Sequence, residues 1–164
     1  MGQQPQMETS HPAADAYRRL YVAQTAVARA IERDLIRTGV SLPQAIALQV
    51  IGTATGAVTA TQLASYMGQE RQSMTGLIDR MESKGWIARV RDLPDRRAIR
   101  LELTGSGRDK LDEITPVTFS AVVQIFDRFS DDELIAMAQT FQDVYDAAAH
   151  QGGAAQLEEA ATTA

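Results

Sequence analysis

Hydrophobic residues recur with helical spacing in three long stretches of this 164-residue chain, at 12–37, 105–129 and 131–149. In each stretch the apolar positions repeat every three or four residues, which is the pattern of an amphipathic helix. The first stretch has about 25 residues and would be roughly 37 Å long as a helix. One small domain cannot cover apolar stripes of this length, so we expect a homodimer in which these helices pack together.

The ends of these helices carry clear signals. Ser10 is suited to cap the first helix, with Pro12 in its first turn and Gly39 after its end. Ser130 and Glu133 have the spacing of a capping box at the start of the last helix. Pro116 removes a backbone donor from the middle helix and should either kink or divide it.

Another helix and a loop follow the first long helix. Ser41, with Pro43 and Gln44 close behind, begins a helix that is apolar nearly all round and should form the buried floor of a lobe. The next segment, 52–58, indicates a loop. Its glycines and threonines could be interpreted as a phosphate cradle, but the G-K-[ST] sequence of a P-loop is missing, so a plain linker is favoured.

Two helical segments separated by Gly68 come next. Thr59 and Gln62 form a capping box for the first segment, and Gly85 follows the end of the second. The second segment places its apolar residues on one face: Met74, Leu77, Ile78 and Met81. Its other face is polar and carries Arg71, Gln72, Ser73, Thr75, Gly76 and Arg80. The spacing predicts a helix-turn-helix with a polar outer surface.

A β-hairpin is predicted directly after this pair of helices. Residues 86–90 and 99–103 alternate between apolar and polar positions, as strands with one buried face do. The residues between them, 91–97, include Pro94 and three arginines. Such a tip suits an anionic partner, although on its own it could equally be a solvated turn.

Four motifs of this region occur in a fixed order: L-A-x-x-M-G, S-M-T-G-L-I-D-R-M-E-x-K-G-W, D-L-P-D-R-R and L-E-L-T-G-S-G. Their order and spacing resemble the MarR family of bacterial transcriptional regulators. The resemblance is strong over the middle third of the chain and rests on pattern alone in the flanking helices. It implies a mainly α fold with a small β-wing, in which a winged helix-turn-helix lobe is joined to long N- and C-terminal dimerisation helices.

The resemblance also implies roles for individual residues. The helix from Arg71 to Arg80 resembles the element that reads the major groove of double-stranded DNA. Arg97 resembles the wing arginine that enters the minor groove, and Asp95 the acid that orients the wing. Gln69 departs from the family, which usually has an apolar residue there. The predicted DNA-binding residues are therefore Arg71, Gln72, Ser73, Thr75, Arg80, Arg91, Arg96 and Arg97, with Asp95 as the orienting residue.

The distribution of charge agrees with a DNA-binding lobe, although the whole chain has a net charge of −5. Between Arg71 and Arg108 there are nine basic residues and five acidic ones, a net charge of +4. The remainder of the chain therefore carries −9. Charges act mainly within a Debye length, about 8 Å in physiological salt, so a local basic surface can dock on DNA.

Composition excludes several other functions. The chain has no cysteine, which removes disulfides, thiol nucleophiles and thiolate metal sites. Its two histidines, His11 and His150, are far apart in the sequence, and no pair of acids stands out as an acid/base couple. We therefore expect neither an enzyme nor a metal or cofactor. No signal peptide or membrane-length apolar run is apparent, which predicts a cytoplasmic protein with no membrane partner.

Together these patterns predict a homodimeric regulator, a repressor that occupies a pseudo-palindromic operator. By the resemblance, a small aromatic or phenolic ligand between the dimer helices and the DNA lobe would release it. An alternative is a winged-helix module that binds protein instead of DNA. The expected division is a disordered tail (1–11), a protomer (12–150) and a second disordered tail (151–164). Within the protomer we expect the lobe at about 41–104 and dimerisation helices at about 12–38 and 105–150.

Overall fold

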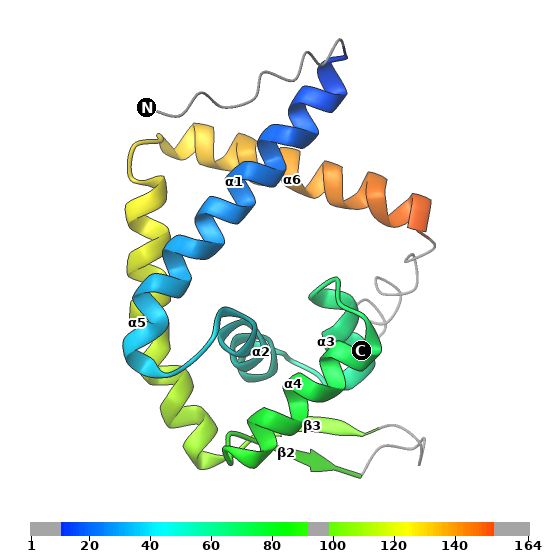
Figure 1. Ribbon diagram of the computed structural model, residues 1–164, viewed down its shortest axis with the longest axis vertical. Helices are drawn as coiled ribbons and strands as arrows, with labels where there is room; N and C mark the ends of the chain where they lie inside the picture. Colours follow the sequence, from blue (N-terminus) through cyan, green and yellow to red (C-terminus); the bar gives the residue numbers. More distant parts are fainter. Residues whose placement is uncertain (1–10, 92–98, 153–164) are drawn as a thin grey trace, which may run out of the picture.

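The computed structural model describes residues 11–91 and 99–152. Three long helices form an open frame, and a smaller lobe of short helices and a sheet fills one end of it (Figure 1). The elements in chain order are α1 (Pro12–Leu35), η1 (Ile36–Thr38), α2 (Leu42–Thr53), β1 (Val58–Thr59), α3 (Ala60–Tyr66), α4 (Arg71–Ser83), β2 (Ile87–Val90), β3 (Arg100–Leu103), α5 (Gly105–Phe126) and α6 (Asp131–Gly152). The predicted mainly α fold with a small β-wing is confirmed.

Helix α1 begins and ends slightly differently from the prediction. Its N-cap is His11, whose ring Nδ1 accepts a hydrogen bond from the Ala13 N–H at 3.2 Å. Ser10, the predicted cap, lies outside the described residues. At the other end the last turn tightens into the 3-10 helix η1, and Gly39 then takes a left-handed conformation with φ 67°. Only glycine adopts this conformation without strain, so Gly39 ends the helix as expected.

Helix α2 lies at the centre of the lobe, where it packs against α1, α4, α5 and β3. The predicted capping box of Ser41 and Gln44 is present: the Ser41 N–H donates to Gln44 Oε1 at 3.1 Å, and Gln44 is only 5% exposed. The prediction of a fully buried helix is only partly right. One side is buried against the core, whereas Ile46, Gln49 and Val50 are half-buried.

The helix-turn-helix has the predicted signals at both ends of its turn. Thr59 and Gln62 cap α3 reciprocally: the Thr59 N–H donates to Gln62 Oε1 at 2.9 Å, and the Gln62 N–H to Thr59 Oγ1 at 3.3 Å. Gly68 has φ 59°, and the next amide, that of Gln69, donates back to the Ala64 carbonyl at 2.9 Å. Gln69 therefore fits the turn, and α4 begins at Arg71.

The wing contains one strand more than the sequence predicted. The order in the sheet is β1-β3-β2, and both pairs are antiparallel. Strand β1 pairs Val58 with Leu101, in a segment that the sequence predicts to be a linker. A strand of two residues is too short to show alternation, so only its pairing with β3 reveals it. The seam between β2 and β3 places Ile87 opposite Leu103 and leads out to the tip.

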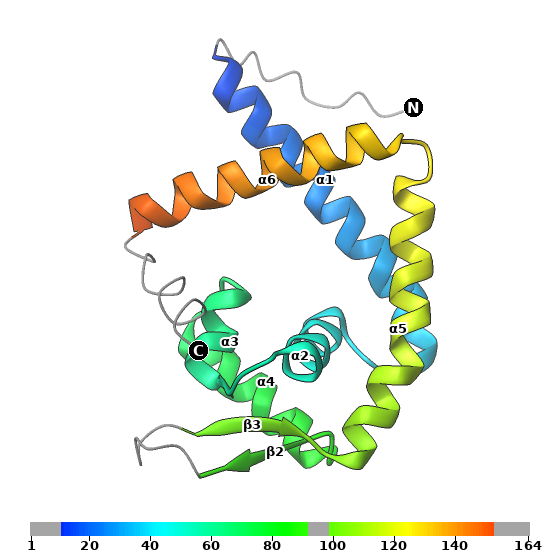
Figure 2. The same ribbon diagram turned by 180° about the vertical axis from the view of Figure 1, so that it is seen from behind.

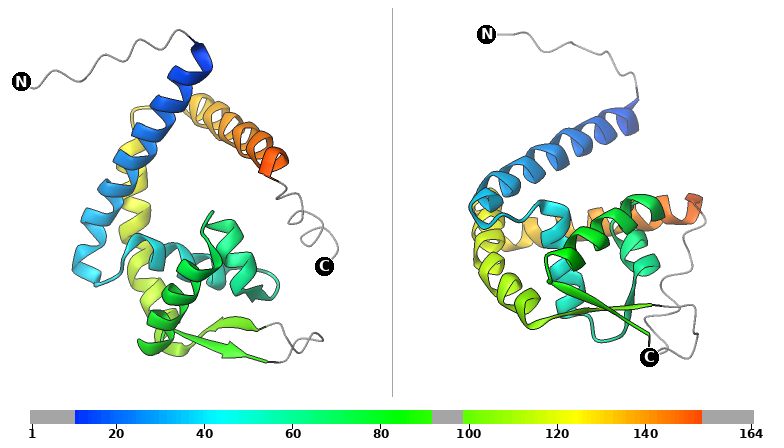
Figure 3. Two further views of the ribbon diagram at one scale, coloured as in Figure 1. Left: turned by 45° about the vertical axis from the view of Figure 1, so that its right-hand side comes forward. Right: turned by 60° about the horizontal axis from the view of Figure 1, so that its bottom comes forward.

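Helices α5 and α6 meet at a sharp elbow (Figure 2). Helix α5 continues through Pro116 without a break and ends at Phe126, earlier than the predicted Phe129. Ser130 caps α6 as expected, with its N–H donating to Glu133 Oε2 at 2.9 Å. Helix α6 then runs to Gly152, two residues further than predicted, and points away from α1 and α5 instead of lying along them (Figure 3).

The core lies beneath the helix-turn-helix. Among the described residues of the three long helices, only those of α1 and α5 next to the lobe contribute to it. Its largest fully buried side chains come from α2, α3, α4 and β2 of the lobe and from the adjoining parts of α1 and α5: Leu35, Leu48, Leu63, Met74, Ile78, Met81, Ile87 and Ile114. Of the expected disordered tails, 1–11 and 151–164, residues 1–10 and 153–164 lie outside the described residues. The bounds of both tails differ from the prediction, because His11 caps α1 and α6 includes residues 151 and 152.

Candidate nucleic-acid interface

Helix α4 presents a polar surface because its apolar face is fixed in the core. Met74, Leu77, Ile78 and Met81 are each no more than 3% exposed, as the spacing predicted. The five residues of this helix that the sequence singled out are all exposed on its other side: Arg71, Gln72, Ser73, Thr75 and Arg80. Burial of four residues thus sets which side chains can reach a partner.

The exposed residues of α4 differ in how they are engaged. Thr75 Oγ1 donates to the Arg71 carbonyl at 3.0 Å, which leaves its methyl group and oxygen lone pairs for a partner. The Ser73 hydroxyl makes no hydrogen bond to any other described residue, so it can both donate and accept. A Cβ at Gly76 would lie 3.4 Å from Arg80 Nη1, so the Arg80 guanidinium lies back along the helix.

The hairpin is braced against α4 by Arg89, a contact that sequence reasoning missed. From β2 the Arg89 guanidinium donates to Asp79 at 2.5 Å and also pairs with Glu82. The hydrogen bond to Asp79 raises the pKa of Arg89. The sequence offered no signal for this brace, because the partners are separated by the turn at Gly85. The brace fixes the hairpin relative to the exposed face of α4.

The internal pairs change how the charge of the lobe is distributed. Arg89 forms ion pairs with Asp79 and Glu82, and Arg100 pairs with Glu102 on the same strand. These two arginines therefore contribute to the hairpin's own structure. Among the described residues that the sequence predicted to bind DNA, the exposed positive charges are Arg71 and Arg80 on α4 and Arg91 after β2.

That connection holds the remaining predicted site residues. Arg91 directly follows β2 and is exposed. Asp95, Arg96 and Arg97 lie in the segment 92–98, outside the described residues, so their predicted roles stay predictions. The two strands that carry the segment are antiparallel and end at the pair Val90 and Arg100, as a hairpin requires.

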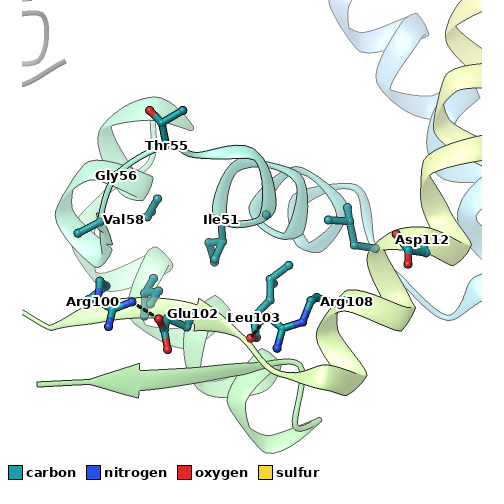
Figure 4. Close-up of a pocket in the computed structure, with 13 residues that line it drawn as sticks. Ile51, Thr55, Gly56, Val58, Arg100, Glu102, Leu103, Arg108 and Asp112 are labelled. Atoms are coloured by element: carbon teal, nitrogen blue, oxygen red, sulfur yellow. Dashed lines mark hydrogen bonds and ion pairs between the residues drawn. The ribbon is translucent and has the colours of Figure 1, made fainter. Parts of the chain in front are cut away.

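A large hollow of about 790 Å³ opens between the end of α2, the sheet and the start of α5 (Figure 4). Apolar side chains such as Ile51 and Val58 line its floor, and charged groups surround its mouth. Arg108 Nη1 donates to the Leu103 carbonyl at 2.9 Å, and Arg100 pairs with Glu102. Because these cations already have protein partners, the hollow gives no clear preference for an anion.

A second hollow lies at the junction of the frame and the lobe. Its volume is about 500 Å³, and its walls come from α1, α2 and the turn after α3. Leu42, Ile46 and Met67 supply apolar surface, whereas Glu32 and Tyr66 supply polar groups. A cavity of this size is in the range that holds small organic ligands.

Residues 11–91 and 99–152 contain neither a candidate metal cluster nor a candidate membrane-spanning helix. No group of three or more His, Cys, Asp or Glu side chains in these residues could hold a metal ion. Among the helices of the same residues, none is long and apolar enough to cross a membrane.

Comparison with known proteins agrees with this geometry. Residues 38–98 match the sequence model of the MarR family. The transcriptional repressor YetL of Bacillus subtilis is 28% identical over 86 residues, 52% of this chain and 52% of YetL. The chain thus spans about half the length of this curated relative.

Solved structures extend the similarity to most of the chain at the level of the fold. CouR from Rhodococcus jostii, bound to p-coumaroyl-CoA, superposes with a TM-score of 0.74 at 24% identity, covering 83% of this chain and 95% of CouR. A mutant of MarR from Escherichia coli in complex with operator DNA superposes with a TM-score of 0.69 at 20% identity, covering 77% of this chain and 91% of that protein.

Proposed function

We propose that this chain, which belongs to the MarR family, is a sequence-specific DNA-binding transcriptional repressor that acts as a homodimer. One observation carries the proposal: the exposed side of α4 holds five polar or basic residues and is braced by Arg89 to a hairpin whose tip is rich in arginine. The name of the relative YetL supports the repressor role, and the MarR complex with operator DNA supports docking through this fold.

In the proposed complex, α4 enters the major groove and the hairpin tip reaches the adjacent minor groove. Ser73, Thr75 and Gln72 contact base edges, with Arg71 or Arg80 beside them. Arg91 and Arg96 meet phosphates, which position the protein without reading sequence. Arg97 enters the minor groove and Asp95 orients the wing, so that narrow, A·T-rich flanks are preferred.

The homodimer is supported by apolar side chains that one protomer leaves uncovered. Tyr17 on α1 is 70% exposed and Phe119 on α5 is 69% exposed. Further exposed apolar side chains on α1, α5 and α6 are Leu20, Tyr21, Val122, Val123, Ile135, Phe141, Val144 and Tyr145. Large apolar side chains exposed in such number on the same helices indicate an interaction surface. A second copy packed on α1, α5 and α6 would cover it.

A dimer also supplies the spacing that a pseudo-palindromic operator needs. Two recognition helices must reach major-groove segments one turn apart, about 34–36 Å along the DNA. We further propose that a small aromatic ligand in the hollow of about 500 Å³ between α1 and the lobe changes this spacing and releases DNA. The aromatic acyl group of the ligand bound to CouR supports that chemical class.

Selection from a library of randomised duplexes, followed by fluorescence anisotropy, tests the proposal. We expect an inverted repeat with half-sites one helical turn apart, and an affinity that falls steeply as salt rises. Arg71→Ala should weaken binding, whereas Arg29→Ala, which removes an exposed charge from α1, should not. Failure to enrich any duplex, together with weak and salt-insensitive binding, would favour the alternative of a module that binds protein.

A further inference from the structure

Both lysines of the chain lie at the same tryptophan. The sequence contains fourteen arginines but only two lysines, Lys84 and Lys110, and a single tryptophan, Trp86. Lys84 Nζ is 4.2 Å from the centroid of the Trp86 ring, and Lys110 Nζ is 5.8 Å from it. Both distances fall within the range in which an ammonium is attracted to the ring face.

Each ammonium also donates a hydrogen bond to one backbone carbonyl of the joint between α1 and α2, which consists of Thr38 and Gly39. Lys84 Nζ donates to the Gly39 carbonyl at 3.3 Å, and Lys110 Nζ to the Thr38 carbonyl at 3.4 Å. The joint is itself ordered, since Thr38 Oγ1 donates to the Leu35 carbonyl at 2.7 Å. Two successive carbonyls at the end of α1 are therefore bound from two different elements.

Trp86 is anchored on both sides. Its N–H donates to the Met81 carbonyl at 3.0 Å, which closes the end of α4, and its carbonyl accepts from the Thr104 N–H at 3.1 Å. Gly107 in the first turn of α5 approaches so closely that an added Cβ would lie 1.8 Å from the Trp86 oxygen. The whole residue is only 8% exposed. The tryptophan thus marks the point where α4, the wing and α5 meet.

The residue types suit this junction. An arginine presents a broad planar fork, whereas a lysine presents a compact charge that can reach one carbonyl and one ring face together. Elsewhere the chain uses arginine for every basic position. Glu113 lies 2.6 Å from Lys110 Nζ and offsets the repulsion between the two ammonium groups. The chemistry of this cluster is thereby distinct from that of the outward-facing basic surface.

We propose that Lys84, Trp86 and Lys110 form a positioning junction that sets the direction of α4 relative to α1 and α5, and so fixes the half-site spacing that the dimer accepts. This inference rests on the proposed function. Helix α4 has 13 residues and a length of roughly 20 Å, so a rotation of about 5° at Lys84 displaces its other end by roughly 2 Å. The junction lies at the end of α4 about which this rotation would occur.

The test compares duplexes that differ only in spacing. The protein is the full chain, and the DNA is the selected duplex with or without one base pair inserted between its half-sites. For the wild type we expect at least a tenfold preference for the selected spacing. In Lys84→Met/Lys110→Met this preference should fall at least threefold, while discrimination against a base change within one half-site stays the same. The double Lys→Arg variant keeps both charges and should retain more of the spacing preference.

The other possible results of this test distinguish failure of the junction from failure of the proposed function. A general loss of structure or of long-range charge would weaken binding to both duplexes equally, so the ratio of the two affinities would stay unchanged. That result would show that the junction does not position α4. Arg29→Met, a lost charge on α1, is the matched control for this effect. If the wild type selects no duplex at all, the proposed function fails and the inference falls with it. If the wild type selects a duplex and the variants keep its spacing preference, only the inference fails.

Chemical modification provides a second readout on the same DNA pair. An amine-selective acetylating reagent neutralises Lys84, Lys110 and the terminal amine, and the double Lys→Arg variant leaves only the terminal amine to react. Acetylation should reduce the spacing preference of the wild type and leave that of the variant unchanged. Emission from Trp86, the sole tryptophan, reports whether the junction has opened. An equal response of both proteins would contradict the assignment.

Discussion

Arg89 on β2 and Asp79 on α4 form an ion pair at 2.5 Å across the turn between helix and wing. Glu82, almost one turn further along α4, pairs with the same guanidinium. The Arg89 side chain is 30% exposed, so the pair is partly shielded from solvent. Asp79 lies on the surface that we propose to face DNA, yet it holds the wing in place. Its negative charge should oppose DNA binding, whereas its contact with Arg89 should favour it.

Asp79→Asn should weaken specific DNA binding, although it removes a negative charge from the proposed interface. A partly exposed pair contributes on the order of 0.2–1 kcal/mol, so we expect a loss of a few-fold in affinity. Anisotropy titration with the selected duplex at low salt measures it. Asp15→Asn is the matched control, because Asp15 pairs with Arg18 and Arg19 on α1. Tighter binding by Asp79→Asn would show that charge outweighs the brace.

Gly107→Ala should strongly destabilise the fold, because the new Cβ would lie 1.8 Å from the Trp86 carbonyl oxygen. Relief requires a backbone shift, so we expect a cost of about 1–3 kcal/mol, as for other overpacked sites. Gly105→Ala is the control in the same turn, since nothing lies within 4 Å of its Cβ position. Thermal unfolding should show a lower midpoint for Gly107→Ala only. Equal midpoints for both variants would contradict the packing argument.

Local signals in the sequence predicted the helices well, since each depends on residues close together in the chain. Thr59 with Gln62 capped α3 as expected, and Gly39, Gly68 and Gly85 all adopt positive φ. The burial of Met74 followed from its spacing with the other apolar residues of α4. These features need no knowledge of distant neighbours.

Features that depend on distant partners were missed. The pairing of Val58 with Leu101 joins positions 43 residues apart, and no short pattern encodes it. The brace from Arg89 was equally hidden, because in the sequence its guanidinium counted only as one more positive charge. The roles of Asp95 and Arg97 were inferred by resemblance and remain predictions, since both residues lie outside the described ranges.

Leu20→Glu with Phe141→Glu should convert the protein to a monomer. Both side chains are exposed on helices that we propose form the dimer interface, and burying a carboxylate there without a partner is costly. Sedimentation should show half the mass, and affinity for the inverted repeat should fall at least tenfold. A chain truncated after Phe129 should behave in the same way. A folded monomer of either form that binds the repeat with full affinity would refute the dimer.

Glu133→Gln should reduce stability at neutral pH but have little effect in acid. The backbone N–H and hydroxyl of Ser130 donate to the Glu133 carboxylate and lower its pKa. A carboxyl whose pKa is lower in the folded state stabilises the fold above its unfolded pKa, and this contribution is lost as the pH falls through the folded value. Unfolding midpoints of the two proteins should therefore differ at pH 7 and converge as the pH falls through the folded pKa of Glu133. A difference independent of pH would contradict the cap.

Ser73→Ala should relax discrimination among operator variants more than Thr75→Ala does. The Ser73 hydroxyl has no hydrogen-bond partner in the described chain, whereas the Thr75 hydroxyl already donates to the Arg71 carbonyl at 3.0 Å. Ser73 can therefore donate to or accept from a base edge, while Thr75 retains only acceptance and its methyl group. A lost base contact is worth about 1–3 kcal/mol at one position.

Anisotropy against single-base variants of the selected duplex measures both changes, with random DNA as the control. Binding to random DNA should hardly change, because it depends on phosphate contacts. Loss of the same size on specific and random duplexes would make these hydroxyls phosphate ligands. If Thr75→Ala instead had the larger effect on discrimination, the prediction would be wrong. The oxygen lone pairs and methyl group of Thr75 would then be sufficient to read a base, although its hydroxyl donates to the Arg71 carbonyl.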